Sequence, residues 1–205
     1  MVLEARHQVG SVGGIVLAAG GSTRMGTNKL LLELDGTTVL RRAVTRTLDA
    51  GLDPVVVVLG HEADKVRELL KNLPARTIVN PDYQEGMNAS LAAGLRALPP
   101  AVTAGVVVLA DMPLVTRDMI AGVLERYRQS GARLVVSEYG GRPAPPVLYD
   151  RSLFAELMAD PGDGMGRSVV SRHRAEAVVV QWPVTALQDL DVPDDYARIS
   201  RLLGG

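Results

Sequence analysis

A short segment near the start of the sequence combines small residues with two cationic side chains. It reads GGSTRMGTNK from Gly20 to Lys29, and its two cationic residues are Arg24 and Lys29. Glycines allow consecutive backbone amides to converge on an anion, while Arg and Lys add charge-assisted contacts to phosphate or carboxylate oxygens. The segment therefore predicts an anion-binding loop. An ordinary strand-to-helix loop with solvated cations would use the same residues, so spacing alone leaves both interpretations open.

Two well-known phosphate-binding motifs do not fit this segment. Gly21 and Gly26 have the spacing of GxxxxGK[ST], but Thr27 stands where that motif requires Lys, and Lys29 precedes Leu30 rather than a hydroxyl residue. The dinucleotide-binding pattern GxGxxG is absent after the apolar run that precedes the loop. The remaining interpretation is a cradle of backbone amides with two added cations.

The elements that must position this loop follow from the apolar pattern. Short Val- and Leu-rich runs predict strands at residues 14–18, 54–59, 76–79, 104–110, 132–137 and 177–180. Helical patterns occupy residues 38–50, 62–72, 87–98, 116–130, 150–159, 167–173 and 194–203, with Thr37 or Thr38 and Thr116 as N-terminal caps and Gly51 and Gly131 as stops. We also expect an antiparallel edge strand at residues 147–149 and a short strand ending near Asp191.

The strands are continuously apolar rather than alternating, which indicates burial on both faces and is typical of a parallel sheet covered by helices. The expected fold class is therefore α/β, with a doubly wound, mostly parallel, Rossmann-like sheet. Ligands of such sheets bind beyond the carboxyl ends of the strands, where the loop would lie. We expect one domain, residues 1–205, with residues 1–12 as a flexible tail and residues 139–175 as a small lobe.

Composition limits the range of partners. The 205 residues carry a net charge of −1 and no Cys, so neither a nucleic-acid surface nor a thiolate metal site is expected. No apolar run approaches the roughly 20 residues of a membrane span. The amino-terminal segment has charged residues where a signal peptide needs an apolar core. We therefore expect a cytoplasmic protein that binds neither a membrane nor a nucleic acid.

The cationic loop is part of a longer pattern. Residues 17–31, LAAGGSTRMGTNKLL, closely resemble the signature L-A-A-G-x-S-x-R-M-G-x-x-K-L-L of MobA-like nucleotidyltransferases, and most of all that of the molybdenum cofactor cytidylyltransferases. The segments GMNASLAAGL, LADMPLVT, GDGMGRSVV and LDVPDDY resemble later motifs of the family in the same order. Asn28 replaces the usual Pro before the motif Lys, and Ala144-Pro145-Pro146 stands where Gly-His-Pro is common. The second departure concerns the acceptor more than the nucleotide.

The resemblance implies a reaction in which a nucleoside monophosphate passes from a nucleoside triphosphate to an acceptor oxygen, with release of pyrophosphate. The cofactor would be Mg²⁺, for which Mn²⁺ can substitute. Arg24 and the loop amides would hold the β- and γ-phosphates, and Lys29 would lie by the α-phosphate, where charge develops. Asp111 and Asp191 are the implied metal ligands, with Asp189 less favoured. Asp111 could instead shape only a turn, and Asp191 could cap only a helix.

The resemblance also implies which residues contact the substrates. The nucleotide-binding residues would be Leu17, Ala18, Ala19, Gly20, Gly21, Ser22, Asn80, Gly86 and Ser90. CTP is favoured over GTP because guanylyl-transferring relatives tend to have Gly at the position of Ala19, whose methyl group narrows the space for a purine. Asn80 could equally form only a turn, and Ser90 could be an ordinary helix residue.

Arg142 and Arg167 are the candidates to contact a small anionic acceptor, although both could also be surface charges. Molybdopterin or the molybdenum cofactor is the implied acceptor, and a molybdoenzyme or its chaperone would then be a protein partner. Three other functions fit the same sequence: nucleotidyl transfer to a sugar or polyol phosphate, guanylyl transfer to the molybdenum cofactor, and nucleotide binding without turnover.

Overall fold

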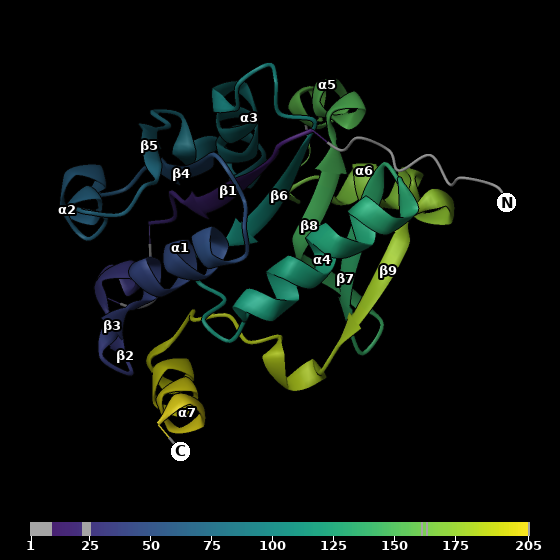
Figure 1. Ribbon diagram of the computed structural model, residues 1–205. Coiled ribbons are helices and arrows are strands. Elements are labelled where there is room, and N and C mark those ends of the chain that lie inside the picture. Colours follow the sequence, from purple (N-terminus) through teal and green to yellow (C-terminus); the bar gives the residue numbers. More distant parts are fainter. Residues whose placement is uncertain (1–9, 22–25, 161, 163, 205) are drawn as a thin grey trace, which may run out of the picture.

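The computed structural model describes residues 10–21, 26–160, 162 and 164–204, and its centre is a seven-stranded sheet with the order β5-β4-β1-β6-β8-β7-β9 (Figure 1). These strands are β1 (Val12–Ala18), β4 (Val55–Leu59), β5 (Arg76–Val79), β6 (Ala104–Leu109), β7 (Leu134–Tyr139), β8 (Arg142–Asp150) and β9 (Val178–Trp182). A separate small hairpin joins β2 (Glu33–Leu34) to β3 (Thr37–Thr38). The tail was expected to span residues 1–12, but Val12 is already the first residue of β1.

Six of the seven strands form a doubly wound α/β arrangement, as predicted. The neighbouring pairs β5–β4, β4–β1, β1–β6 and β7–β9 are parallel. The exception is β8, which pairs antiparallel with both β6 and β7. The expected edge strand at residues 147–149 was therefore predicted with the right direction but the wrong place, because it is flanked on both sides and Val147, Leu148 and Tyr149 are buried. The segment 139–175 thus contributes a strand to the interior of the sheet.

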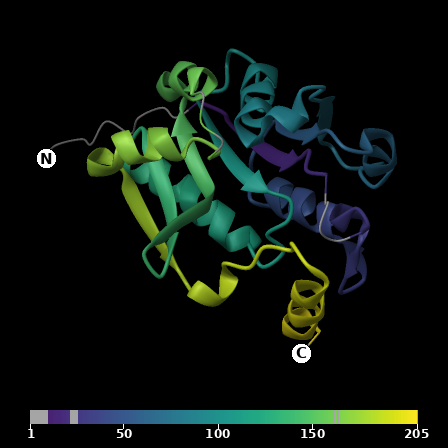
Figure 2. The ribbon, with the colours of Figure 1, turned by 180° about the vertical axis from the view of Figure 1, so that it is seen from behind.

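Helices cover both faces of the sheet. They are α1 (Val39–Asp49), α2 (Ala63–Glu68), α3 (Met87–Ala97), α4 (Arg117–Ser130), α5 (Phe154–Ala159), α6 (Arg167–Arg172) and α7 (Pro193–Leu203). Residues of α1, α2 and α4 pack with Val16 and Val57 on one face, whereas residues of α3, α5 and α6 pack with Ile15 and Val58 on the other. Figure 1 shows the α1 and α4 side, and Figure 2 shows the other side. In the described part of the chain, no helix has the length and apolarity required to span a bilayer.

The helix ends follow local chemistry. The Thr38 hydroxyl accepts a hydrogen bond from the Arg41 N–H at the start of α1, and Thr116 does the same for Met119 at the start of α4. Gly131 ends α4 with a φ of +63°, a conformation that glycine adopts without strain.

The helix expected at residues 62–72 is shorter in the structure. Glu62 has a φ of +51°, so the regular helix begins only at Ala63. After Glu68 the backbone N–H groups of Leu69, Leu70 and Lys71 bond three residues back instead of four. The chain therefore tightens into turns before β5.

Candidate active site

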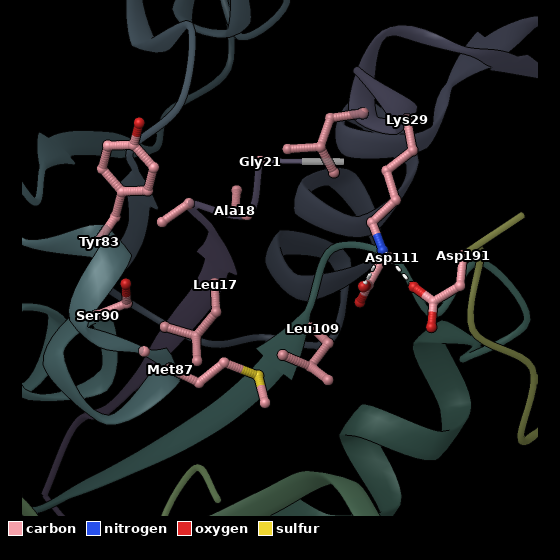
Figure 3. A pocket seen from close by; sticks show the side chains of 14 residues that line it. Leu17, Ala18, Gly21, Lys29, Tyr83, Met87, Ser90, Leu109, Asp111 and Asp191 are labelled. Atoms are coloured by element: carbon pink, nitrogen blue, oxygen red, sulfur yellow. Dashed lines mark hydrogen bonds and ion pairs between the residues drawn. The ribbon is translucent and has the colours of Figure 1, made fainter. Parts of the chain in front are cut away.

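A cavity of about 380 Å³ lies at the carboxyl ends of β1 and β6 (Figure 3). Leu17 of β1 pairs with Leu109 of β6, so the chain segments that follow these two strands leave the sheet side by side. The cavity is lined by Leu17, Ala18, Ala19, Gly20, Gly21, Lys29, Leu30, Tyr83, Gly86, Met87, Ser90, Leu109, Asp111 and Asp191. Most residues predicted to contact nucleotide, phosphate or metal are thus brought together. Ser22 and Arg24 lie outside the described residues.

Lys29 stands between two carboxylates. Its Nζ lies 2.6 Å from Oδ2 of Asp111 and 2.8 Å from Oδ1 of Asp191, and Figure 3 shows both contacts. Burial alone would lower the pKa of Lys29, but the charges and hydrogen bonds of Asp111 and Asp191 outweigh burial and raise it above its ordinary value. Lys29 is therefore a fixed cation at the wall of the cavity.

A short 3₁₀ helix, Lys29–Leu31, sets the position of Lys29. The Asn28 side chain begins this helix: its Oδ1 accepts from the Leu30 N–H at 3.1 Å, and its Nδ2 donates to Glu62 at 3.3 Å. Asn28 is the residue that departs from the family pattern. Here an Asn cap does what a Pro at a helix start would do by fixing the backbone.

Main-chain contacts bring the two carboxylates together. Leu190, which is fully buried, donates its N–H to the carbonyl oxygen of Asp111 at 3.0 Å. The expected short strand before Pro193 does not form, because residues 187–192 make this isolated contact instead of a ladder. The helix-capping interpretation of Asp191 is also wrong, because the Asp195 side chain accepts from the N–H groups of both Asp191 and Val192 at 3.0 Å.

The Asp111–Asp191 pair has the chemistry of a site for a hard divalent cation. Two carboxylate oxygens already converge on one positive group, and Mg²⁺ is commonly held by one or two carboxylates together with waters and phosphate oxygens. Across the described ranges, no three His, Asp or Glu side chains form a metal-binding cluster. The protein can therefore supply two ligands there, and water and substrate oxygens would fill the remaining coordination positions of the ion.

Arg46 fastens the segment after Asp111 to α1. One of its guanidinium nitrogens, Nη1, donates to the carbonyl oxygens of Pro113 and Val115, each at 2.7 Å. Burial, with a further contribution from the nearby Arg42, lowers the pKa of Arg46. This arginine thus supports the backbone that carries Asp111.

The far side of the cavity is built around Ser90 at the start of α3. Asn80, predicted to touch the nucleotide, lies behind Ser90: its Nδ2 donates to the Ser90 hydroxyl at 3.1 Å, and both residues are buried. The Asn80 side chain also accepts from the Asp82 N–H, which completes a turn. Asn80 therefore orients Ser90, which lines the cavity.

Tyr83 lines the same wall and was missed from the sequence. It belongs to the 3₁₀ helix Tyr83–Glu85, and a Cβ at Gly60 would lie 2.7 Å from the Tyr83 Cβ and from the Ala19 carbonyl oxygen. Gly60 thus permits close approach of these segments. Its place could have been predicted from the sequence, because aromatic residues are scarce in this chain and Tyr83 comes just before the motif that begins at Gly86.

A second cavity, of about 580 Å³, adjoins the first. It shares Met87 and Leu109 with it, and its other lining residues are Met112, Arg142, Pro143, Ala144, Pro145, Val147, Tyr149, Gly164, Met165, Arg167, Val170, Ser171, Arg174, Leu187 and Asp189. Both arginines predicted to meet an acceptor thus lie here, and among the described residues neither has an acidic partner. A third arginine, Arg174, was missed; it is paired with the buried Glu138, which also accepts from Gln181.

Asp189 faces the second cavity rather than the first. Burial, together with repulsion from Asp111 and Asp191, raises its pKa to about 6. Two acidic residues of the segment are therefore divided between the cavities: Asp191 lines the first, where it contacts Lys29, and Asp189 lines the second.

The chain matches the MobA-like NTP transferase domain over residues 14–178 and belongs to this family of nucleotidyltransferases. It is 28% identical to the purine catabolism protein PucB of Bacillus subtilis over 200 residues, covering 93% of this chain and 96% of the relative. It is 27% identical to the molybdenum cofactor cytidylyltransferase of Escherichia coli over 186 residues, covering 89% and 92%.

Solved structures are similar over almost the whole chain. The crystal structure of Rv0371c from Mycobacterium tuberculosis has a TM-score of 0.84 and 29% identity, and covers 94% of this chain and 99% of that one. A structure of the same mycobacterial protein in complex with manganese has a TM-score of 0.79 and 27% identity, and covers 93% and 98%. The predicted family, fold class and enzyme class are therefore confirmed.

Proposed function

We propose that this protein transfers cytidine monophosphate from CTP to a phosphorylated acceptor, the molybdenum cofactor or molybdopterin, and releases pyrophosphate. One arrangement carries the proposal: a cavity with a lysine between two carboxylates adjoins a larger cavity with two arginines that have no acidic partner among the described residues. The first suits a triphosphate and the second an anionic acceptor, and a shared wall suits direct transfer between them.

Each group has a role in this reaction. The backbone of Gly20 and Gly21, with Arg24 and Ser22, would bind the triphosphate, and Lys29 would neutralise charge at the α-phosphate. Asp111 and Asp191 would hold Mg²⁺, which would supply Lewis-acid stabilisation of the phosphate oxygens. Mn²⁺ would substitute, in keeping with the manganese complex of the mycobacterial relative.

The walls of the two cavities support the proposed base and acceptor. Ser90, supported by Asn80, and the methyl group of Ala19 would favour the smaller base of CTP. Arg142 and Arg167 would bind the anionic part of the acceptor, and the product would pass to a molybdoenzyme or its chaperone. The cytidylyltransferase of E. coli among the relatives supports this choice.

The test is pyrophosphate release, measured with a coupled phosphate assay. The purified protein is given Mg²⁺ or Mn²⁺, CTP or GTP, and either molybdenum cofactor, a panel of sugar and polyol phosphates, or no acceptor. The proposal expects release only with CTP and molybdenum cofactor. Pyrophosphate release with a sugar or polyol phosphate would show that the proposed acceptor is wrong, and release with GTP would show that the proposed nucleotide is wrong. Nucleotide binding without release under any condition would rule out turnover.

A further inference from the structure

Asn88, the second residue of α3, is buried at 8% exposure and lines neither cavity. Its side chain is nevertheless fully engaged at both polar atoms. Nδ2 donates to the carbonyl oxygen of Asp160 at 3.1 Å, and Oδ1 accepts from the N–H of Gly166 at 3.1 Å. A buried Asn held in this way fixes two backbone points relative to its own helix.

Those two backbone points bracket the connection between α5 and α6. Asp160 follows the last residue of α5, and Gly166 precedes the first residue of α6. Asp160 also organises the connection internally, because its carboxylate accepts from the Gly162 N–H and the Ser168 hydroxyl. Asn88 alone among these side chains ties the connection to α3.

Gly166 leaves little freedom at the second point. Its φ is +74°, and a Cβ there would lie 2.6 Å from Cδ2 of Leu157 and 3.1 Å from the Tyr149 hydroxyl. The backbone can therefore approach Asn88 and Tyr149 this closely only because residue 166 is glycine.

The link runs between the two cavities. The start of α3 supplies Gly86, Met87 and Ser90 to the first cavity. The α5–α6 connection and the start of α6 supply Gly164, Met165 and Arg167 to the second. Asn88 therefore joins these two walls through its two hydrogen bonds.

We propose that Asn88 is a positioning residue that sets the acceptor-side wall of Met165 and Arg167 at a defined place relative to the nucleotide-side helix. This inference rests on the proposed function for its catalytic consequence. Without Asn88, the acceptor groups are misplaced although the nucleotide still binds. Its signature is a rise in the KM of the acceptor while the Kd of the nucleotide stays unchanged.

Three variants test this role. Asn88→Ala removes both hydrogen bonds, and Asn88→Asp keeps the size and the acceptor for Gly166 but turns a carboxylate oxygen towards the Asp160 carbonyl oxygen. Ser168→Ala, in the first turn of α6, is the matched control, because it removes a hydrogen bond to Asp160 that does not involve α3. With molybdenum cofactor as the acceptor, we expect Asn88→Ala to raise its KM about tenfold, since each lost hydrogen bond typically accounts for a few-fold. Asn88→Asp should give a rise at least as large, because its carboxylate faces the Asp160 carbonyl oxygen without a donor between them, and Ser168→Ala should give a change below about twofold.

Two further measurements separate positioning from a general loss of structure. Isothermal titration with CTP and Mg²⁺ should give Kd values that agree within about twofold for the wild type and all variants. Hydrogen exchange of the ligand-free protein should be faster in Asn88→Ala over residues 160–167, with the central sheet unchanged. If Asn88→Ala does not fold, Asn88→Ser, which keeps a small polar side chain but is too short to make both hydrogen bonds, carries the same measurements.

Two results overturn the inference: an acceptor KM in Asn88→Ala that equals the wild-type value, or a nucleotide Kd that rises as much as the acceptor KM. A wild-type protein that releases no pyrophosphate with any acceptor would instead overturn the proposed function. Hydrogen exchange then still decides the structural role, since unchanged exchange over residues 160–167 would show that Asn88 does not hold this wall.

Discussion

The backbone N–H of Leu190 donates to the carbonyl oxygen of Asp111 at 3.0 Å, and this contact holds the segment of the second carboxylate beside that of the first. The Leu190 side chain is fully buried, so the segment cannot slide without exposing it. The next residue, Asp191, is thereby placed opposite the same lysine that Asp111 contacts. The buried side chain of Leu190 and its main-chain hydrogen bond thus help to bring the two carboxylates to the same lysine.

Replacing Lys29 by Met should separate catalysis from metal binding. We expect turnover to fall at least about a hundredfold, as for other lost preorganised charge contacts. Mn²⁺ affinity without nucleotide, measured by electron paramagnetic resonance, should rise, because the ammonium group no longer competes for Asp111 and Asp191. Lys71→Met, an exposed lysine paired with Glu68, is the control. Near-normal turnover at saturating nucleotide would refute the assigned role.

Asp111→Asn and Asp191→Asn should each raise the Mg²⁺ concentration needed for half-maximal activity, by at least about tenfold, since outer-shell changes alone reach this range. Asp194→Asn is the control: this exposed carboxylate lies in the first turn of α7, so its loss should leave the Mg²⁺ requirement unchanged. A raised requirement in Asp111→Asn alone would mean that the protein supplies one ligand.

Ala19→Gly should weaken the preference for CTP over GTP. The Ala19 methyl group lies at the wall of the nucleotide cavity, and one methyl group typically contributes about 1–3 kcal/mol of discrimination. The measurement is competitive binding of CTP and GTP in the presence of Mg²⁺. Tighter binding of GTP by the unaltered protein would reverse the assignment of the base.

The carboxylate of Asp150 predicts a pH-dependent contribution to stability. Burial alone would raise its pKa, but hydrogen bonds from Ser152 and Tyr127 outweigh burial and hold the pKa of Asp150 below its usual range. Its stabilisation is therefore complete above the unfolded-state pKa, about 3.9, and is lost as the pH falls through the lower folded-state pKa.

Asp150→Asn should accordingly lower the melting temperature at pH 7, and its difference from the wild type should shrink as the pH falls below about 4. Thermal melts followed by circular dichroism between pH 3 and pH 7 measure this. Asp118→Asn, at an exposed position paired with its neighbour Arg117, is the control. A difference that stays constant over this range would contradict the pKa assignment.

Local chemistry made much of the fold predictable. The hydroxyl groups of Thr38 and Thr116 mark the starts of two helices, and Gly131, which has no side chain, marks the end of α4. The apolar runs of β1 and β6 mark buried strands. Asp111 was predictable at the carboxyl edge because it follows the apolar run of β6 directly. These features depend on neighbours within a few positions.

Features that depend on distant partners were not predictable. The place of β8 is decided by pairing with both β6 and β7, and its residues carry no mark of this. Asn80 was assigned to the nucleotide, yet its partner is Ser90, ten positions away. Arg174 lines the second cavity and pairs with Glu138 of β7, 36 positions away.

The joining of Lys29 to Asp191 spans 162 positions of the chain. Because a protein emerges from the ribosome amino end first, β1, β4 and β6 can pair before the segment around Asp191 has been synthesised. A nascent chain can thus display its glycine-rich loop while the second carboxylate is still missing. Completion of the lysine–carboxylate cluster is therefore a late event in the synthesis of the molecule.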